Sequence, residues 1–111
     1  MTSGSSETEQ EILLVAIVQM AAGSIEQGRD YEDFVLARLG EHGGSLERRA
    51  RTADAATEVH LIRFSSRAGY ESFLADPERT AYRERLGVAA PSTKVLEVQD
   101  VPPRPEPAGE T

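Results

Sequence analysis

The apolar run at residues 11–20, EILLVAIVQM, constrains the fold more than any other part of this sequence. Its length and its Val and Ile content favour a β-strand. Successive side chains of a strand point to opposite faces, and this run is apolar at both parities. The sequence therefore predicts a strand that is covered on both sides.

A helix is expected after this strand. Asp30 is its predicted N-cap, which places Glu32 and Asp33 in the first turn, where the helix dipole favours acids. Tyr31 and the apolar residues that follow it recur at helical spacing. The His-Gly-Gly sequence at 42–44 predicts the C-terminal stop.

Three further segments have the composition of strands. Residues 45–52, SLERRART, are polar and predict a strand at the edge of a sheet. Residues 57–64, TEVHLIRF, are rich in β-branched and aromatic residues and predict a central strand. Residues 93–101, TKVLEVQDV, predict the last strand.

A second helical region separates the last two strands. Ser65 or Ser66 is expected to cap it, Pro77 interrupts it, and a short further helix runs to about Leu86. The predicted order is then β-α-β-β-α-β. This is the ferredoxin-like α+β fold, in which four antiparallel strands carry both helices on one face.

Residues 11–101 are expected to form one ferredoxin-like domain between two disordered tails. Residues 1–10 carry a single apolar residue, and residues 102–111 hold four of the six prolines. Helices cover only one face of the predicted sheet, whereas the strands are apolar on both. We therefore expect a homodimer, formed either by plain association of the free faces or around a ligand chamber between them.

Composition excludes several classes of function. A net charge of −7 argues against a nucleic-acid partner. The absence of cysteine excludes disulfides and thiolate ligands, and two histidines far apart in sequence predict no metal site. Glycine-rich nucleotide motifs are missing, so no cofactor is expected. With no apolar run of ~18–20 residues and an acidic start, we expect a cytoplasmic protein without membrane contact.

His60 is the strongest candidate for chemistry. It lies in the middle of a predicted central strand, where a polar side chain is costly unless it is paired. Alternation places it on the same face as Glu58 and Phe64. A neutral imidazole near pH 7 can accept or donate a proton, so His60 is either an acid–base group or a hydrogen-bonded core residue.

Weaker candidates surround it in the sequence. His42 falls in the last turn of the first helix, where a cation favours the helix dipole. Arg83 either stabilises developing negative charge or pairs with Glu78 or Asp76 on the surface. Three tyrosines are potential hydrogen-bond donors to a phenolate or enolate, namely Tyr31, Tyr70 and Tyr82.

Residues 59–86 resemble the antibiotic biosynthesis monooxygenases of the dimeric α/β-barrel superfamily. Those cofactor-free enzymes oxidise aromatic polyketide phenols with molecular oxygen. The resemblance assigns the aromatic residue at the end of the third strand to Phe64, the early helix tyrosine to Tyr70 and the arginine after Asp-Pro to Arg83. Phe64 stands where that family usually has Trp, and His60 where it has Asn.

A second resemblance is to the tetracenomycin-type polyketide cyclases, which close aromatic rings by aldol chemistry. It rests on His60-Leu61-Ile62 in the third strand and on Glu41-His42 followed by Arg48-Arg49 after the first helix. It implies a pocket lined by His60, His42 and an arginine.

These observations lead to one hypothesis and two alternatives. The hypothesis is a cofactor-independent tailoring enzyme, a cyclase or isomerase in which His60 moves a proton on an aromatic or polyketide-like molecule. Arg83 and a tyrosine would hold the oxyanion, and Phe64 would stack on the ring. The alternatives are a cofactor-free antibiotic biosynthesis monooxygenase and a non-catalytic dimer that binds a small molecule or serves as an accessory subunit. In the dimer, a cavity of ~300 Å³ or more that touches His60 would favour catalysis.

Overall fold

The computed structural model describes residues 10–103 of the 111-residue chain. The predicted tails at 1–10 and 102–111 lie outside these residues except at their inner ends. Within residues 10–103, no helix is both long enough and apolar enough to cross a membrane.

The sheet has four antiparallel strands in the order β2-β3-β1-β4. Their bounds are Ile12–Gln19 for β1, Gly44–Arg51 for β2, Thr57–Phe64 for β3 and Ser92–Val98 for β4. The polar strand β2 lies at one edge, and β1 and β3 are central, as their compositions predict. The last strand is shorter than expected and ends at Val98 instead of residue 101.

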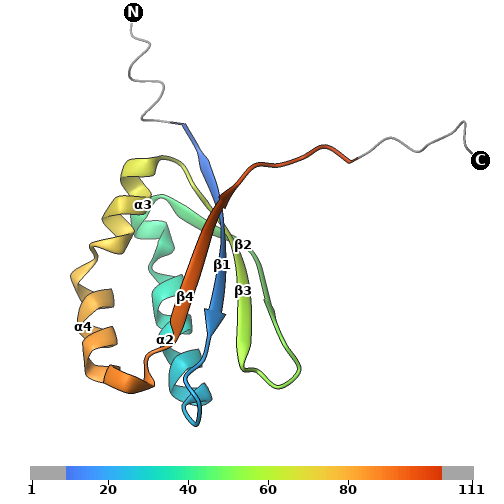
Figure 1. Ribbon diagram of the computed structural model, residues 1–111. Coiled ribbons are helices and arrows are strands. Elements are labelled where there is room, and N and C mark those ends of the chain that lie inside the picture. Colours follow the sequence, from blue (N-terminus) through green and yellow to red (C-terminus); the bar gives the residue numbers. More distant parts are fainter. Residues whose placement is uncertain (1–9, 104–111) are drawn as a thin grey trace, which may run out of the picture.

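Three α-helices lie on the same side of this sheet (Figure 1). They are α2 (Ile25–Ala37), α3 (Arg67–Leu74) and α4 (Pro77–Leu86), with short 3₁₀ turns η1 (Leu39–His42) and η2 (Gly87–Ala89). With α3 and α4 forming one interrupted helical region, the order is β-α-β-β-α-β. The predicted α+β ferredoxin-like arrangement is therefore confirmed.

Helix α2 corrects one sequence-based prediction. It begins at Ile25, whereas the sequence indicated a start after Asp30. Its first turn includes Gly28, a poor helix former, which hid the true start from pattern analysis. Gly28 packs against Met20, and a Cβ at this position would force the methionine sulfur to move. Glu32 consequently lies in the middle of α2 and not in a solvent-exposed first turn.

The core forms between the helices and the inner face of the sheet. Alternation in β3 points Glu58, His60, Ile62 and Phe64 inward, and all four are buried. The apolar core cluster comprises Ile12, Leu14, Tyr31, Val35, Leu39, Ile62, Phe64 and Phe73. The inner face of β3 is thus apolar at one end and carries two ionisable side chains at the other.

The interruption between α3 and α4 follows the predicted capping chemistry. The Ser66 hydroxyl accepts a hydrogen bond from the Gly69 backbone N–H at 3.0 Å. Asp76 accepts one from the Glu78 N–H at 2.9 Å, and Pro77 is the first residue of α4. Proline at that position loses no helical hydrogen bond, so the chain turns here without penalty.

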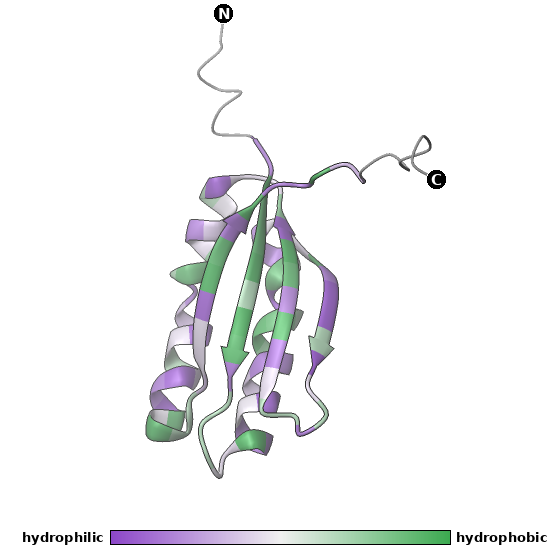
Figure 2. Ribbon diagram, turned by 45° about the vertical axis from the view of Figure 1, so that its right-hand side comes forward, coloured by the Kyte–Doolittle hydropathy of each residue, from purple (hydrophilic) through white to green (hydrophobic). Residues whose placement is uncertain are grey.

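The outer face of the sheet carries no helix (Figure 2). Cross-strand pairing places Val15 and Ile17 of β1 beside Leu61 and Val59 of β3 on this face, with Leu96 of β4 next to Val15. Val59 is 41% exposed and Leu96 43% exposed. In Figure 2, β1 is mostly green and the edge strand β2 mostly purple, so apolar residues are concentrated in a central strand and polar ones at this edge.

Candidate functional site

A cavity lies between α2 and the inner face of the sheet, and His60 forms part of its wall. Its volume is about 70 Å³. Ligand pockets usually measure ~300 Å³ or more, so the cavity of the single chain is smaller than the size that favours catalysis. Leu74 and Val95, each 42% exposed, lie at its rim and extend the apolar surface outward.

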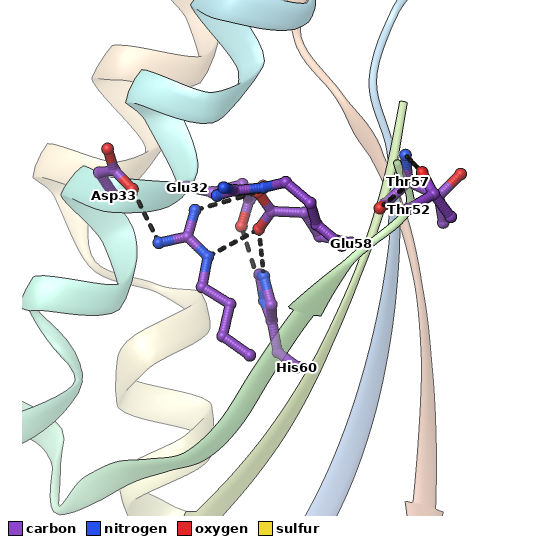
Figure 3. Close-up of polar contacts among 8 residues, drawn as sticks. Glu32, Asp33, Thr52, Thr57, Glu58 and His60 are labelled. Carbon is purple, nitrogen blue, oxygen red and sulfur yellow. Dashed lines mark hydrogen bonds and ion pairs between the residues drawn. The ribbon is translucent and has the colours of Figure 1, made fainter. Parts of the chain in front are cut away.

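Glu58 accepts a hydrogen bond from one ring nitrogen of His60. Glu58 is fully buried and His60 is 1% exposed, and the Nε2 atom of His60 lies 2.8 Å from Oε1 of Glu58 (Figure 3). Because an ionised carboxylate only accepts hydrogen bonds, this contact assigns the imidazole proton to Nε2. The Nδ1 atom is then free to accept a proton.

Two arginines of the edge strand keep Glu58 ionised. Arg49 donates from Nε and Nη2 to the two carboxylate oxygens at 2.8 and 3.1 Å, and Arg51 donates from Nε at 2.9 Å. Burial alone would raise the pKa of Glu58, but the hydrogen bonds from Arg49, His60 and Arg51 lower it to about 2. Arg49 also donates to Asp33 of α2 at 2.8 Å, which joins the cluster to the helix.

Glu32 is the second carboxyl group near His60. Its Oε1 atom lies 3.9 Å from Nδ1 of His60 (Figure 3), and no residue within 10–103 makes a hydrogen bond to its carboxyl group. Burial raises its pKa to about 7, the charge of Glu58 adds to this effect, and Arg49 is the largest opposing influence. Burial also lowers the pKa of His60. At neutral pH the cavity wall therefore holds a carboxyl group that is only partly ionised beside a neutral imidazole.

Tyr31 adds a second polar group without a partner. It is 2% exposed and lines the cavity, and its hydroxyl makes no hydrogen bond to any residue that the structure describes. Buried hydroxyls are normally paired with protein or water. A ligand or water oxygen in the cavity would satisfy this one.

Arg83 adds positive charge to the cavity wall. Its Nη2 atom donates to the carbonyl oxygen of Pro91 at 2.7 Å, and its guanidinium carbon lies 5.8 Å from the centre of the Tyr31 ring. The alternative in which Arg83 pairs with Glu78 or Asp76 does not hold. A main-chain carbonyl carries no formal charge, so the guanidinium charge remains available to a ligand.

Five of the eight predicted site residues line this one cavity: Tyr31, His60, Phe64, Tyr70 and Arg83. The other three do not. Glu58 lies behind His60, and Tyr82 packs edge-on against Tyr31 with ring centres 5.3 Å apart. His42 belongs to a separate cluster at the start of α4.

Sequence analysis missed Glu32 and Arg79, which also line the cavity. The signal for Glu32 was present, because it shares helical spacing with the buried residues Gly28, Tyr31 and Val35. Placing the helix start at Asp30 turned this position into an ordinary first-turn acid and concealed it.

The cluster around His42 has a structural role. Glu41, His42 and Asp76 offer ligand atoms within 4.8 Å of one another, a spacing that suits a cation. Arg38, however, donates from Nε and Nη2 to both oxygens of Asp76, at 2.7 and 3.1 Å. Hydrogen bonds from Arg38 and His42 hold the pKa of Asp76 well below its usual range. This carboxylate ties η1 to the first turn of α4.

Solved structures with the same fold include a cofactor-independent oxygenase. SnoaB, a cofactor-independent oxygenase from Streptomyces nogalater, is 16% identical, with a TM-score of 0.66 over 87% of this chain and 99% of its own. Rv0793 from Mycobacterium tuberculosis is 18% identical, with a TM-score of 0.64 over 83% of this chain and 98% of its own.

A protein from Nitrosomonas europaea that bears the name antibiotic biosynthesis monooxygenase is 11% identical, with a TM-score of 0.65 over 86% of this chain and 94% of its own. No protein-family model and no curated protein sequence matches the chain. At these identities the likeness establishes the shared fold, and function has to be argued from the cavity.

Proposed function

We propose that this protein is a cofactor-independent enzyme that moves protons on an aromatic or polyketide-like small molecule, as a cyclase or isomerase. The observation that carries the proposal is the state of His60. Its Nε2 is tied to an ionised Glu58 at 2.8 Å, and its Nδ1 is left free in the wall of a cavity. A positioned neutral imidazole is the usual general base near pH 7.

The neighbouring side chains suit the charge that such a step creates. Removing a proton from an acidic C–H or a phenol leaves negative charge on a ligand oxygen. Arg83 supplies a positive charge in the same wall, and Tyr31 supplies a hydroxyl donor. Phe64 and Tyr70, with ring centres 5.4 Å apart, offer an aromatic surface for the ring of the ligand.

The size of the cavity limits how the substrate binds. About 70 Å³ admits the reacting part of a molecule, and the remainder lies across the apolar rim at Leu74 and Val95. A substrate of one or two fused rings matches this arrangement better than a long polyketide chain that is wholly enclosed.

Oxygenation is a second candidate, and the fold shared with the oxygenase SnoaB favours it. It begins with the same deprotonation by His60. The electron-rich ligand anion would then reduce molecular oxygen, which enters as a co-reactant. The two candidates differ in one readout, because only oxygenation consumes oxygen when a phenol such as 2-naphthol is supplied under air.

The first experiment follows hydrogen exchange in 2-tetralone, a two-ring ketone with acidic α-protons. Proton NMR in D₂O measures how fast these protons are replaced. We expect the wild-type protein to accelerate exchange and His60→Gln to lose ~10²–10⁴-fold of that acceleration while the probe still binds. His42→Gln is the matched control. Equal rates in the wild type and His60→Gln, at equal melting temperatures, would refute the proposal.

We also propose that the protein works as a homodimer joined through the outer face of the sheet. The support is the apolar surface formed by Val59, Leu61 and Leu96, which no element within residues 10–103 covers. Light scattering should give about twice the chain mass of 12.1 kDa. Charges introduced by Val59→Lys and Leu96→Lys should return it to one chain mass. A wild-type mass near that of one chain contradicts the dimer.

A further inference from the structure

We propose that Glu32 is a second catalytic residue, an acid that works opposite His60, and that the substrate is an enolisable carbonyl compound. This inference rests on the proposed function and deepens it, because it names the partner of His60 and the class of substrate. It follows from the position of Glu32 in the cavity wall, its contacts and the unpaired hydroxyl beside it.

The position of Glu32 is unusual for a structural carboxyl group. It lies on the buried face of α2 at 4% exposure, and no residue within 10–103 makes a hydrogen bond to its carboxyl group. Its carboxyl group therefore stands at the cavity without a protein partner among these residues. Glu58, in contrast, has every lone-pair direction served by Arg49, Arg51 or His60. Of these two carboxyl groups, Glu32 is the one whose bonding capacity toward the cavity is free.

Charged and titratable groups reach Glu32 from three elements. Glu58 and His60 face it from β3, Arg49 from β2, and Arg79 and Arg83 from α4. The carboxylate of Glu58 and the burial of the site disfavour a second negative charge. The three arginines limit that effect, so Glu32 can both give up a proton and recover it near neutral pH.

The free groups match one kind of ligand. Glu32 as an acid and Tyr31 as a hydroxyl are two donors, and Nδ1 of His60 is one acceptor, all in the wall of the same cavity. A carbonyl oxygen takes two donors through its two lone pairs. The adjacent acidic C–H bond then meets the acceptor.

The resulting step balances without any co-reactant. Nδ1 of His60 takes the proton from the α-carbon, and the C–H electron pair becomes the C=C bond of an enol. The carbonyl π electrons form an O–H bond with the proton that Glu32 releases. The ligand has then gained and lost one proton, and the protein holds an imidazolium beside a carboxylate.

The 3.9 Å separation between His60 Nδ1 and Glu32 Oε1 explains how the two side chains regain their starting protonation states. The imidazolium and the carboxylate form an ion pair across this gap. Passing the proton from Nδ1 to Oε1 restores the starting state once the product leaves. A ring-closing reaction uses the same cycle, because the enol carbon attacks a second carbonyl and the new hydroxyl takes its proton from the pair.

The test uses exchange in 2-tetralone as a function of pH. Glu32→Gln should lower the rate by ~10²-fold, and Glu32→Asp should recover part of it. The wild-type rate should fall above about pH 7, where Glu32 loses its proton, and Glu32→Gln should lack this alkaline decline. Glu26→Gln, an exposed position on the same helix, is the matched control and should behave as the wild type.

The outcomes separate this inference from the proposed function. If His60→Gln loses exchange but Glu32→Gln keeps the wild-type rate and alkaline decline, the role of Glu32 is overturned and that of His60 stands. If the wild-type protein neither binds 2-tetralone nor accelerates exchange, the proposed function fails, and the inference with it.

A second measurement avoids the variants altogether. Carbon-13 NMR of the wild-type Glu32 carboxyl group should show a pKa near 7, and an ordinary glutamate pKa would overturn the acid role.

Discussion

Two clusters in this molecule combine a histidine, a carboxylate and arginine, and they differ in one respect. In the cluster at the start of α4, both ring nitrogens of His42 are paired, Nδ1 with Ser72 at 2.8 Å and Nε2 with Asp76 at 2.9 Å. In the cluster on β3, only Nε2 of His60 is paired at hydrogen-bond distance, with Glu58.

The difference lies in what surrounds the histidine. The His42 cluster joins η1 to α3 and to the start of α4, and both ring nitrogens of its histidine are engaged, so it is a structural junction. The His60 cluster borders a cavity that also exposes the unpaired Glu32 and Tyr31. Residue types alone do not separate the two clusters. The two clusters are distinguished by polar groups that lack a hydrogen-bond partner and lie beside a cavity, which the His60 cluster has.

The largest effect that we expect from this difference concerns pH and stability. The pKa of Glu32 is raised from 4.5 to about 7 in the folded protein, so folding favours the protonated form. This contribution is fully present below about pH 4.5 and is lost as the pH rises through 7. The wild type should lose up to ~3 kcal/mol of unfolding free energy relative to Glu32→Gln over this window.

Urea unfolding of both proteins at pH 4.5 and pH 8 measures this difference. Glu58 acts in the opposite direction, because its pKa is lowered, but its window lies between about pH 2 and 4.5 and does not overlap. A constant difference between the wild type and Glu32→Gln across pH 4.5–8 would remove the physical distinction between the two clusters.

A smaller effect is expected from Glu58→Gln. This change removes the charge that Arg49 and Arg51 neutralise. It leaves Arg51 without a counter-ion within residues 10–103 and Arg49 with the exposed Asp33 alone. Breaking a fully buried ion pair costs ~3–5 kcal/mol, and here we expect ~2 kcal/mol because both arginine side chains reach solvent. Denaturant midpoints at pH 7 test this. A neutral effect would show that Glu58 does not anchor His60.

The smallest effect is expected from His42→Gln. It removes one hydrogen bond to Asp76 or Ser72, which is worth ~1 kcal/mol, while Arg38 keeps Asp76 paired. Stability should fall by that amount, and exchange in 2-tetralone should stay at the wild-type rate. Loss of exchange without loss of stability would place the active site at the His42 cluster and contradict the role of His60.

The sequence predicts the fold well because its signals are local. Alternation in residues 57–64 places His60 and Phe64 on one face, and the Asp-Pro pair marks the start of α4. Both signals depend on neighbours in the chain, and the structure confirms both.

The site is less predictable because it depends on contacts between distant elements. Glu32 of α2 is a candidate because it lies beside His60 of β3, and the pairing of His42 with Asp76 spans 34 residues. Pattern analysis sees neither contact. It also starts α2 too late, since the glycine that packs against Met20 resembles a break in the helix. Because the predicted start of α2 was too late by more than one turn, Glu32 was not recognised as a residue of the cavity wall.

The most direct test of the central claim is to map where 2-tetralone binds. Proton–nitrogen NMR spectra of the labelled wild-type protein, recorded with increasing amounts of the probe, report which backbone amides move. The account predicts the largest shifts at Tyr31, Glu32 and His60, and none beyond noise at His42 and Ser72. Shifts centred on His42, or confined to the outer face of the sheet, would contradict it.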